Sequence, residues 1–230
     1  ASGADSIGTA VSLIRAGKAD VILAGGTESI YCALILGGLA AARALSGNND
    51  PAACRPFDLC RDGMVMGEGA GVVVVESLEH ALRRGAAVYG EVLGYGSSSD
   101  GHHVTAPSVR GQVVCMRQAL QDAGIEPDAV NYINAHGTST PVGDKTETAS
   151  IKEVFGSQAY RIPVSSTKAA TGHTLGAAGT VETVICLKAI EQGILPPTLN
   201  LVEKDPECDL DYVPGQARAA RVEVALSNSF

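Results

Sequence analysis

The chain has 230 residues, 45% of them hydrophobic, which is enough for one large domain or two small ones with a buried core. A formal net charge of −8 and an aromatic content of 4% argue against a nucleic-acid-binding surface. No apolar run is long enough to span a bilayer, and the first residues lack the basic-then-apolar pattern of a secretion signal. The six cysteines include no Cys-x-x-Cys pair, which argues against a zinc site or a disulfide framework. We therefore expect a cytoplasmic protein with no metal, no membrane contact and no nucleic-acid partner.

The first third of the chain predicts helices that alternate with strands. We expect helices over 3–16, 30–45 and 76–84, a buried strand over 21–24 and a second strand over 71–75. The helix over 30–45 should break at Gly37 and Gly38, because glycine weakens a helix interior. The uninterrupted run from Gly71 to Val75 predicts a central strand that is buried on both faces.

The rest of the chain continues this alternation. We expect strands over 89–94, 130–134, 162–166 and 222–226 and helices over 109–123, 144–155 and 173–192. Gly124 and Gly193 follow two of these helices as stop signals. Asp144, with Glu147 three residues later, has the pattern of an N-cap and its capping box. Strands that alternate with helices indicate a layered α/β fold.

Four charged residues lie in the loop over 55–69. They are Asp58, Arg61, Asp62 and Glu68. They can form a charged network, and we interpret this segment as a salt-bridged structural loop rather than as a site.

Two histidines and one lysine follow predicted strands, where open α/β sheets commonly place ligand-handling residues. His136 follows the strand over 130–134, and Lys168 and His173 follow the strand over 162–166. Two imidazole N–H donors and an ammonium group that converge on one oxygen would stabilise an enolate or a tetrahedral oxyanion. The alternatives are hydrogen-bonded core histidines and an ordinary surface lysine.

Glu182 lies on the small-residue face of the helix over 173–192. A carboxylate on a packed face needs a partner, for which Lys168 or a backbone amide is the candidate, and the alternative is a solvated glutamate. No nucleophile stands out at a helix N-terminus, where acyl transfer would need one. The best helix for it begins at Ala1, so the residue that matters would precede the chain.

Several motifs are long enough to compare with known families. Two are Asn134-Ala135-His136-Gly137-Thr138-Ser139-Thr140-Pro141-Val142-Gly143-Asp144 and Ser165-Ser166-Thr167-Lys168-x-x-Thr171-Gly172-His173-x-Leu175-Gly176-Ala177-Ala178-Gly179-x-x-Glu182. Others are Arg55-Pro56-Phe57-Asp58, Met66-Gly67-Glu68-Gly69-Ala70-Gly71 and Pro196-Pro197-Thr198-Leu199-Asn200-Leu201. Together these motifs resemble the β-ketoacyl synthases, most closely the elongating synthase II type of bacterial fatty acid synthesis. The likeness covers essentially the whole chain.

The resemblance implies a thiolase-like fold, in which two similar α/β halves form five layers, αβαβα. Residues 1–84 would be the remainder of the N-terminal half, and 85–230 would be the C-terminal half. The family pattern places the nucleophilic cysteine immediately before Ala1 and a glycine-rich turn just after Phe230. We therefore expect a chain truncated at both ends, lacking the N-terminal part of the fold, and inactive on its own.

The resemblance also assigns catalytic roles. His136 and His173 would polarise the malonyl thioester carbonyl and stabilise the enolate that remains after CO2 leaves. Lys168 would order the site and hold its charge balance, with Glu182 as its buried structural partner.

Substrate and carrier contacts follow from the same likeness. Thr138 and Thr140 would bind the phosphopantetheine arm, and Thr105 would lie in a mobile gate. Leu39 stands near the acyl pocket, where a phenylalanine is common, and Arg43 stands where related enzymes contact the acidic carrier protein. Phe230 belongs to the segment that leads into the acyl-gating turn.

The implied activity is a decarboxylative Claisen condensation of an acyl thioester with malonyl-acyl carrier protein, in fatty acid or polyketide elongation. It needs no cofactor, because the substrates are carried on the phosphopantetheine of the acyl carrier protein. The implied partners are that carrier protein and a second copy in a homodimer, or a chain-length factor in a heterodimer. The alternatives are a non-catalytic chain-length-factor-like subunit, a thiolase-type acyl transferase that uses coenzyme A, and a generic α/β binding module.

Overall fold

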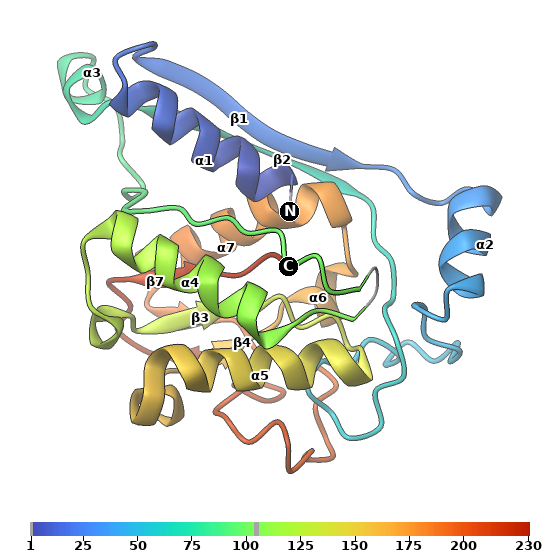
Figure 1. The fold of residues 1–230 in the computed structure, drawn as a ribbon. Helices are drawn as coiled ribbons and strands as arrows, with labels where there is room; N and C mark the ends of the chain where they lie inside the picture. The colour runs from blue at the N-terminus through green and yellow to red at the C-terminus, as the bar shows by residue number, and fades with distance from the viewer. Residues whose placement is uncertain (1, 104–105) are drawn as a thin grey trace.

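The computed structural model describes residues 2–103 and 106–230, which form alternating layers of sheet and helix (Figure 1). The helices are α1 (Ser2–Arg15), α2 (Ala33–Ala41), α3 (Leu78–Arg83), α4 (Val109–Ala123), α5 (Pro141–Phe155), α6 (Lys168–Thr171) and α7 (Ala178–Gln192). The strands are β1 (Val21–Glu28), β2 (Gly69–Glu76), β3 (Tyr132–Asn134), β4 (Val164–Ser165), β5 (Ile194–Leu195), β6 (Arg218–Ala219) and β7 (Ala225–Ser227). Short 3-10 turns lie at Pro127–Ala129, Gly156–Tyr160 and Leu175–Ala177.

The first sheet pairs β1 with β2 in antiparallel register, with Ala24 opposite Val73. Helix α1 packs on this sheet through a small apolar cluster that includes both residues. On the same face, Gly71 lies so close to α7 that a Cβ atom there would come within 2.9 Å of Thr180 Oγ1. Helices α1 and α7 therefore lie side by side against one face of the first sheet.

The second sheet is parallel, with strand order β4-β3-β7. Helices α4 and α5 cover one face through the main apolar core, in which Met116 and Ile151 pack with Ile133 of β3. Helix α7 covers the other face, where Cys186 packs against Tyr132. The layers are thus sheet, α1 with α7, sheet, and α4 with α5, so the described residues form four of the five predicted layers (Figure 1). The division into halves between residues 84 and 85 stays a prediction.

The burial predicted for the two N-terminal strands is wrong on one face. Val72 and Val74 of β2 are 64% and 58% exposed, and Leu23 of β1 is 72% exposed. Burial alternates along β2, because only the face toward α1 and α7 is covered by the described residues. A valine run predicts a strand, but it does not show what covers the strand's second face.

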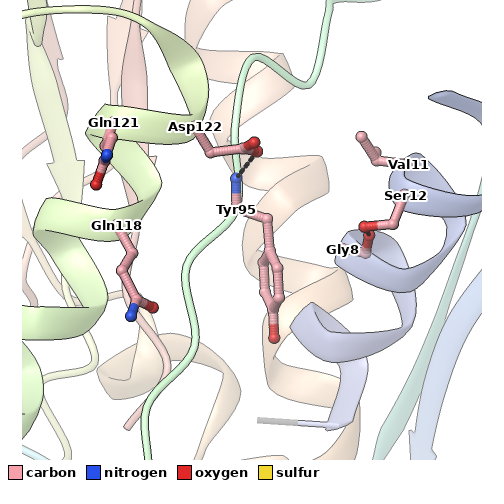
Figure 2. A pocket seen from close by; sticks show the side chains of 7 residues that line it. All are labelled: Gly8, Val11, Ser12, Tyr95, Gln118, Gln121 and Asp122. Carbon is pink, nitrogen blue, oxygen red and sulfur yellow. Dashed lines mark hydrogen bonds between the residues drawn. The ribbon is translucent and has the colours of Figure 1, made fainter. Parts of the chain in front are cut away.

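The strand predicted over 89–94 is absent from the described residues, where this segment runs without a sheet partner between α1 and α4. Side chains of the two helices hold the backbone of this segment and of Tyr95 just after it, and Figure 2 shows the contact from Asp122 of α4 to Tyr95. The amide of Tyr95 donates to Asp122 Oδ2 at 3.0 Å, and the Arg15 guanidinium donates to the carbonyl of Leu93 at 2.6 Å. These bonds replace part of a strand ladder.

The helices predicted over 30–45 and 144–155 also differ from those in the structure. Helix α2 is shorter than 30–45 and does not break at its glycines: the Ala42 amide still donates to the Gly38 carbonyl at 2.9 Å. Glycine costs a helix about 1 kcal/mol relative to alanine but keeps its hydrogen bonds. The N-cap of α5 is Thr140, whose Oγ1 accepts the Gly143 amide, and not Asp144. Pro141 fits the first helical position because that position needs no amide donor.

The predicted stops at Gly124 and Gly193 are confirmed, with left-handed φ angles of 65° and 63°.

Within 2–103 and 106–230, no helix combines the length and the hydrophobicity that a membrane crossing requires.

Candidate active site

The structure brings His136 and His173 together at the carboxyl ends of β3 and β4. Their ring centroids lie 5.2 Å apart, and the rings are nearly perpendicular at 84°. His136 follows β3 after one residue, and His173 follows β4 through the single turn of α6. Adjacent parallel strands end at one edge of a sheet, which places both rings at the same point.

The backbone of each histidine is fixed by residues that are distant in the sequence. The amides of His136 and Gly137 each donate to the buried carboxylate of Glu147 at 2.8 Å. His173 donates its amide to the Val65 carbonyl at 2.8 Å, and its own carbonyl accepts the Gly67 amide at 3.0 Å. His173 therefore lies in a short extended pairing and not in the helix predicted over 173–192, which begins at Ala178. The backbone of both histidines is therefore held in place by these hydrogen bonds.

Both imidazoles are neutral at neutral pH. Burial, with a further contribution from the Lys168 ammonium, lowers the pKa of His173 to about 3. The same two causes, with His173 as a third, hold the pKa of His136 well below its ordinary value of 6.5. A neutral imidazole has one N–H donor and one acceptor nitrogen. Each ring can thus donate one hydrogen bond to a bound oxygen and accept one at its other nitrogen.

Lys168 and Glu182 form a buried ion pair between the start of α6 and the first turns of α7. Their side chains are 1% and 3% exposed. Burial raises the pKa of Glu182, and the Lys168 ammonium opposes that rise. The expectation that Lys168 is the partner of Glu182 is confirmed, and the alternatives of a surface lysine and a solvated glutamate are wrong.

Phe230 lies beside His136, and the two threonines follow His136 in the same turn. The Phe230 ring centroid is 6.0 Å from that of His136. Thr138 is buried, and its Oγ1 lies 3.1 Å from Oγ1 of Thr140. The turn that carries His136 thus also carries both hydroxyls.

Leu39 and Arg43 do not join this group. Leu39 is half-buried on α2, which projects at one side of the fold and has no buried residue (Figure 1). Arg43 follows α2, is exposed and has a φ of 55°. Thr105 lies outside the described residues. Their predicted roles stay predictions.

Glu147 is a site residue that the sequence reasoning missed. It was interpreted as half of a capping box, but its carboxylate is 1% exposed and also accepts Asn228 Nδ2 at 3.0 Å. The spacing of four residues between Glu147 and the apolar Ile151 was the available signal, because it places a carboxylate on the core-facing side of a helix.

The loop over 55–69 has a structural role, as expected, but its charged residues do not pair with one another as ions. Arg61 pairs with Asp205 at 2.8 Å, while the Asp58 carboxylate accepts backbone amides, including that of Val202 at 2.8 Å. Asp62 accepts the Ser46 hydroxyl. The partners of Arg61 and Asp58 thus include residues more than 100 positions away in the sequence.

A surface cavity of about 460 Å³ lies away from these residues, between α1 and α4. Figure 2 shows Tyr95 at its centre, with Ser12 on one side and Gln118 on the other. None of the predicted site residues lines it.

Comparisons with known proteins place the chain in a family. The description "Beta-ketoacyl synthase, N-terminal domain" matches residues 1–81, and "Beta-ketoacyl synthase, C-terminal domain" matches 89–202. The chain belongs to the β-ketoacyl synthase family. The resemblance drawn from the sequence motifs is confirmed.

Two curated relatives are both named 3-oxoacyl-[acyl-carrier-protein] synthase 2. The one from Synechocystis is 53% identical over 234 residues, and the one from Coxiella burnetii is 51% identical over 233. Each match covers 100% of this chain and 56% of the relative, so the chain spans little more than half the length of either protein.

Solved structures also match over nearly the whole chain. A β-ketoacyl synthase from Burkholderia phymatum has a TM-score of 0.94 and 42% identity, over 99% of this chain and 56% of that one. Another match is a type II polyketide synthase ketosynthase that was solved with its acyl-carrier protein and a bound hexaketide. Its TM-score is 0.95 and its identity is 43%, over 98% of this chain and 56% of the ketosynthase chain. The ishigamide ketosynthase/chain length factor has a TM-score of 0.93 and 41% identity, over 100% of this chain and 55% of its own. The thiolase-like fold class predicted from the sequence is confirmed.

Proposed function

We propose that the protein containing these residues catalyses decarboxylative condensation of an acyl thioester with malonyl-acyl carrier protein, giving 3-oxoacyl-acyl carrier protein. The observation that carries the proposal is the pair of neutral imidazoles, of buried His173 and partly buried His136, whose ring centroids lie 5.2 Å apart at the ends of two adjacent strands. The names of the Synechocystis and Coxiella relatives support the same reaction.

The first half-reaction is acyl transfer to a cysteine thiolate. Its sulfur attacks the acyl thioester carbonyl, and the carrier thiol leaves. Burial raises the pKa of Cys54 and Cys208 to about 11 and that of Cys186 to about 12, so these thiols stay protonated. The family likeness instead places the nucleophile immediately before Ala1, at the N-terminal end of α1, where the helix dipole favours a thiolate.

The second half-reaction uses the two histidines. The malonyl carboxylate leaves as CO2 when its C–C bond breaks, and the electron pair moves onto the thioester oxygen as an enolate. The N–H groups of His136 and His173 would donate to that oxygen in a site where burial excludes competing water. The enolate carbon then attacks the acyl-cysteine carbonyl, and the cysteine thiolate leaves. Burial and the fixed positive charge of Lys168 would together keep both rings neutral, so that each ring presents one N–H donor and one acceptor nitrogen.

We also propose the finer roles that the resemblance implies. Thr138 and Thr140 would bind the phosphopantetheine arm, Arg43 would contact the carrier protein, and no separate cofactor would take part. The protein would act in the cytoplasm, as a homodimer or with a chain-length factor.

The alternative is a chain-length-factor-like subunit without condensing activity. The high TM-score to a ketosynthase/chain length factor structure supports this second reading. The intact set of His136, Lys168 and His173 favours the enzyme, because a subunit that only limits chain length has no need of converging donors.

A chimaera tests the proposal. The 230 residues replace the matching segment of the Synechocystis relative, with the Coxiella relative as a second host, and condensation and malonyl decarboxylation are assayed with carrier-linked substrates. We expect condensation, and we expect His136→Ala or His173→Ala to lower decarboxylation by roughly a hundred- to a thousandfold. The exposed His102→Ala serves as the control. Folded chimaeras of both hosts that do not condense, or histidine variants that decarboxylate normally, would refute the proposal.

A further inference from the structure

Arg61 is a buried cation that the proposed chemistry does not use. Its side chain is 1% exposed. The guanidinium donates from Nε to the Thr140 carbonyl at 3.1 Å and from Nη2 to the Pro141 carbonyl at 3.1 Å. Its Nη1 donates to the Asp58 carbonyl at 2.7 Å and to Asp205 Oδ2 at 2.8 Å. Four of the five N–H groups of the guanidinium therefore bond to partners from three separate segments.

Stability alone gives little reason for a cation at this position. Thr140 and Pro141 form the N-terminus of α5, where the helix dipole disfavours positive charge. Two buried carboxylates offset the charge: Asp205, and Asp144, whose Oδ2 lies 3.4 Å from Arg61 Nε. Replacing such a buried ionic group with apolar side chains is often neutral or stabilising. A buried network of this kind can instead specify one backbone geometry.

The backbone that Arg61 holds is a strained one. Gly137 and Ser139 have left-handed φ angles of 35° and 67°, on either side of Thr138. A non-glycine residue in this region costs about 1 to 3 kcal/mol and persists only where its surroundings determine it. The Ser139 hydroxyl accepts the Arg55 amide at 3.0 Å, a second contact from the same loop as Arg61.

The same loop continues to the second histidine. Val65 and Gly67, a few residues beyond Arg61, make the two backbone hydrogen bonds that hold His173. One continuous segment over 55–67 thus contacts the turn that carries His136 and also the turn that carries His173. The relative placement of the two turns depends on this segment.

We propose that Arg61 is a positioning residue, which fixes the turn over 138–141 so that the Thr138 and Thr140 hydroxyls receive the carrier's phosphopantetheine arm. This inference rests on the proposed function. His136 itself is held by Glu147, so Arg61 sets arm binding more than the donation to the enolate. Its loss raises the KM for carrier thioesters and changes the kcat of malonyl decarboxylation much less.

Two variants of the chimaera separate geometry from charge. Arg61→Lys keeps the positive charge but has no planar fork to reach both carbonyls. Arg61→Met combined with Asp205→Asn removes the ion pair with Asp205. It leaves Asp144 without its cationic partner, but burial raises the pKa of Asp144 to about 7, so that this carboxyl group can be neutralised by a proton. The control is Arg117→Met, which removes an exposed arginine contact to Glu153 on α5.

We expect both Arg61 variants to fold. Their kcat/KM for the acyl-carrier thioester should fall by roughly ten- to a hundredfold, mainly because KM rises. Displacement of a binding group by about 1 Å costs that much. Amide hydrogen exchange over 138–143 should be faster than in the parent. Arg117→Met should match the parent in every readout.

Parent-like KM and parent-like exchange in either folded Arg61 variant would overturn the inference, since charge balance would then be the whole role. Failure of the parent chimaera to condense would refute the proposed function, whereas the exchange comparison would still decide whether Arg61 orders this turn.

Discussion

Replacing His173 by asparagine should change how the stability of the fold depends on pH. The pKa of His173 is lowered to about 3 in the folded protein, mainly by burial, against 6.5 in an unfolded chain. Between these values the unfolded chain binds a proton on this ring and the folded protein does not. The free energy of unfolding is therefore unaffected by this ring above pH 6.5, and it decreases as the pH falls from 6.5 toward 3. At about 1.4 kcal/mol per pH unit, the loss between pH 6.5 and pH 5 is about 2 kcal/mol.

Other buried groups act in the opposite direction over part of this range. Burial raises the pKa of Asp144 to about 7, so the folded protein binds a proton there before the unfolded chain does, and stability rises as the pH falls through 7. The total profile thus mixes both signs, and only the difference between the parent and His173→Asn isolates the ring.

Urea unfolding of the chimaera at pH 7, 6 and 5 measures this difference. The parent should lose about 2 kcal/mol more than His173→Asn on going from pH 7 to pH 5. The exposed His102→Asn serves as the matched control and should follow the parent. Parallel curves for the parent and His173→Asn would refute the argument, because they would mean that the folded ring takes up its proton as readily as the unfolded one.

Two further predictions concern backbone placement. Glu147→Ala removes the acceptor of the His136 and Gly137 amides, so malonyl decarboxylation should fall by roughly a hundredfold; an unchanged kcat in a folded variant would show that this anchor is dispensable. Gly8→Ala should destabilise the fold by about 1 to 3 kcal/mol, because its Cβ would lie 2.4 Å from the Tyr95 ring. Gly37→Ala, in an exposed helix with nothing within 4 Å, should instead stabilise it by about 0.5 to 1 kcal/mol, and thermal unfolding would show whether the two changes differ in sign.

The sequence was most informative where a signal is local. Gly124 and Gly193 end their helices with left-handed φ angles, as glycine after a periodic segment predicts. His136 and His173 lie together because both follow strands, and adjacent parallel strands end at one edge. Strand order itself was not needed to expect them at the same end of the sheet.

Burial on the second face of a strand was not predictable in this way. A run of valines such as that of β2 occurs in strands covered on one face and in strands covered on both, and here Val72 and Val74 are exposed. The segment over 89–94 has the composition of a strand, yet without a partner strand among the described residues it is held by Arg15 and Asp122 side chains. In both cases the outcome depends on neighbours that are distant in the sequence.

The same reasoning explains why the roles of Arg61 and Glu147 were not predicted from the sequence, whereas those of the histidines were. A catalytic group is recognised by its own chemistry, since few side chains can donate to a developing oxyanion. Arg61 and Glu147 act on backbone atoms, and a carbonyl or an amide belongs to every residue and carries no sequence signature. The Thr140 and Pro141 carbonyls that Arg61 binds lie 79 and 80 positions away, so no local period connects them. A buried charge in a loop of unassigned role is therefore best examined for the strained backbone it holds.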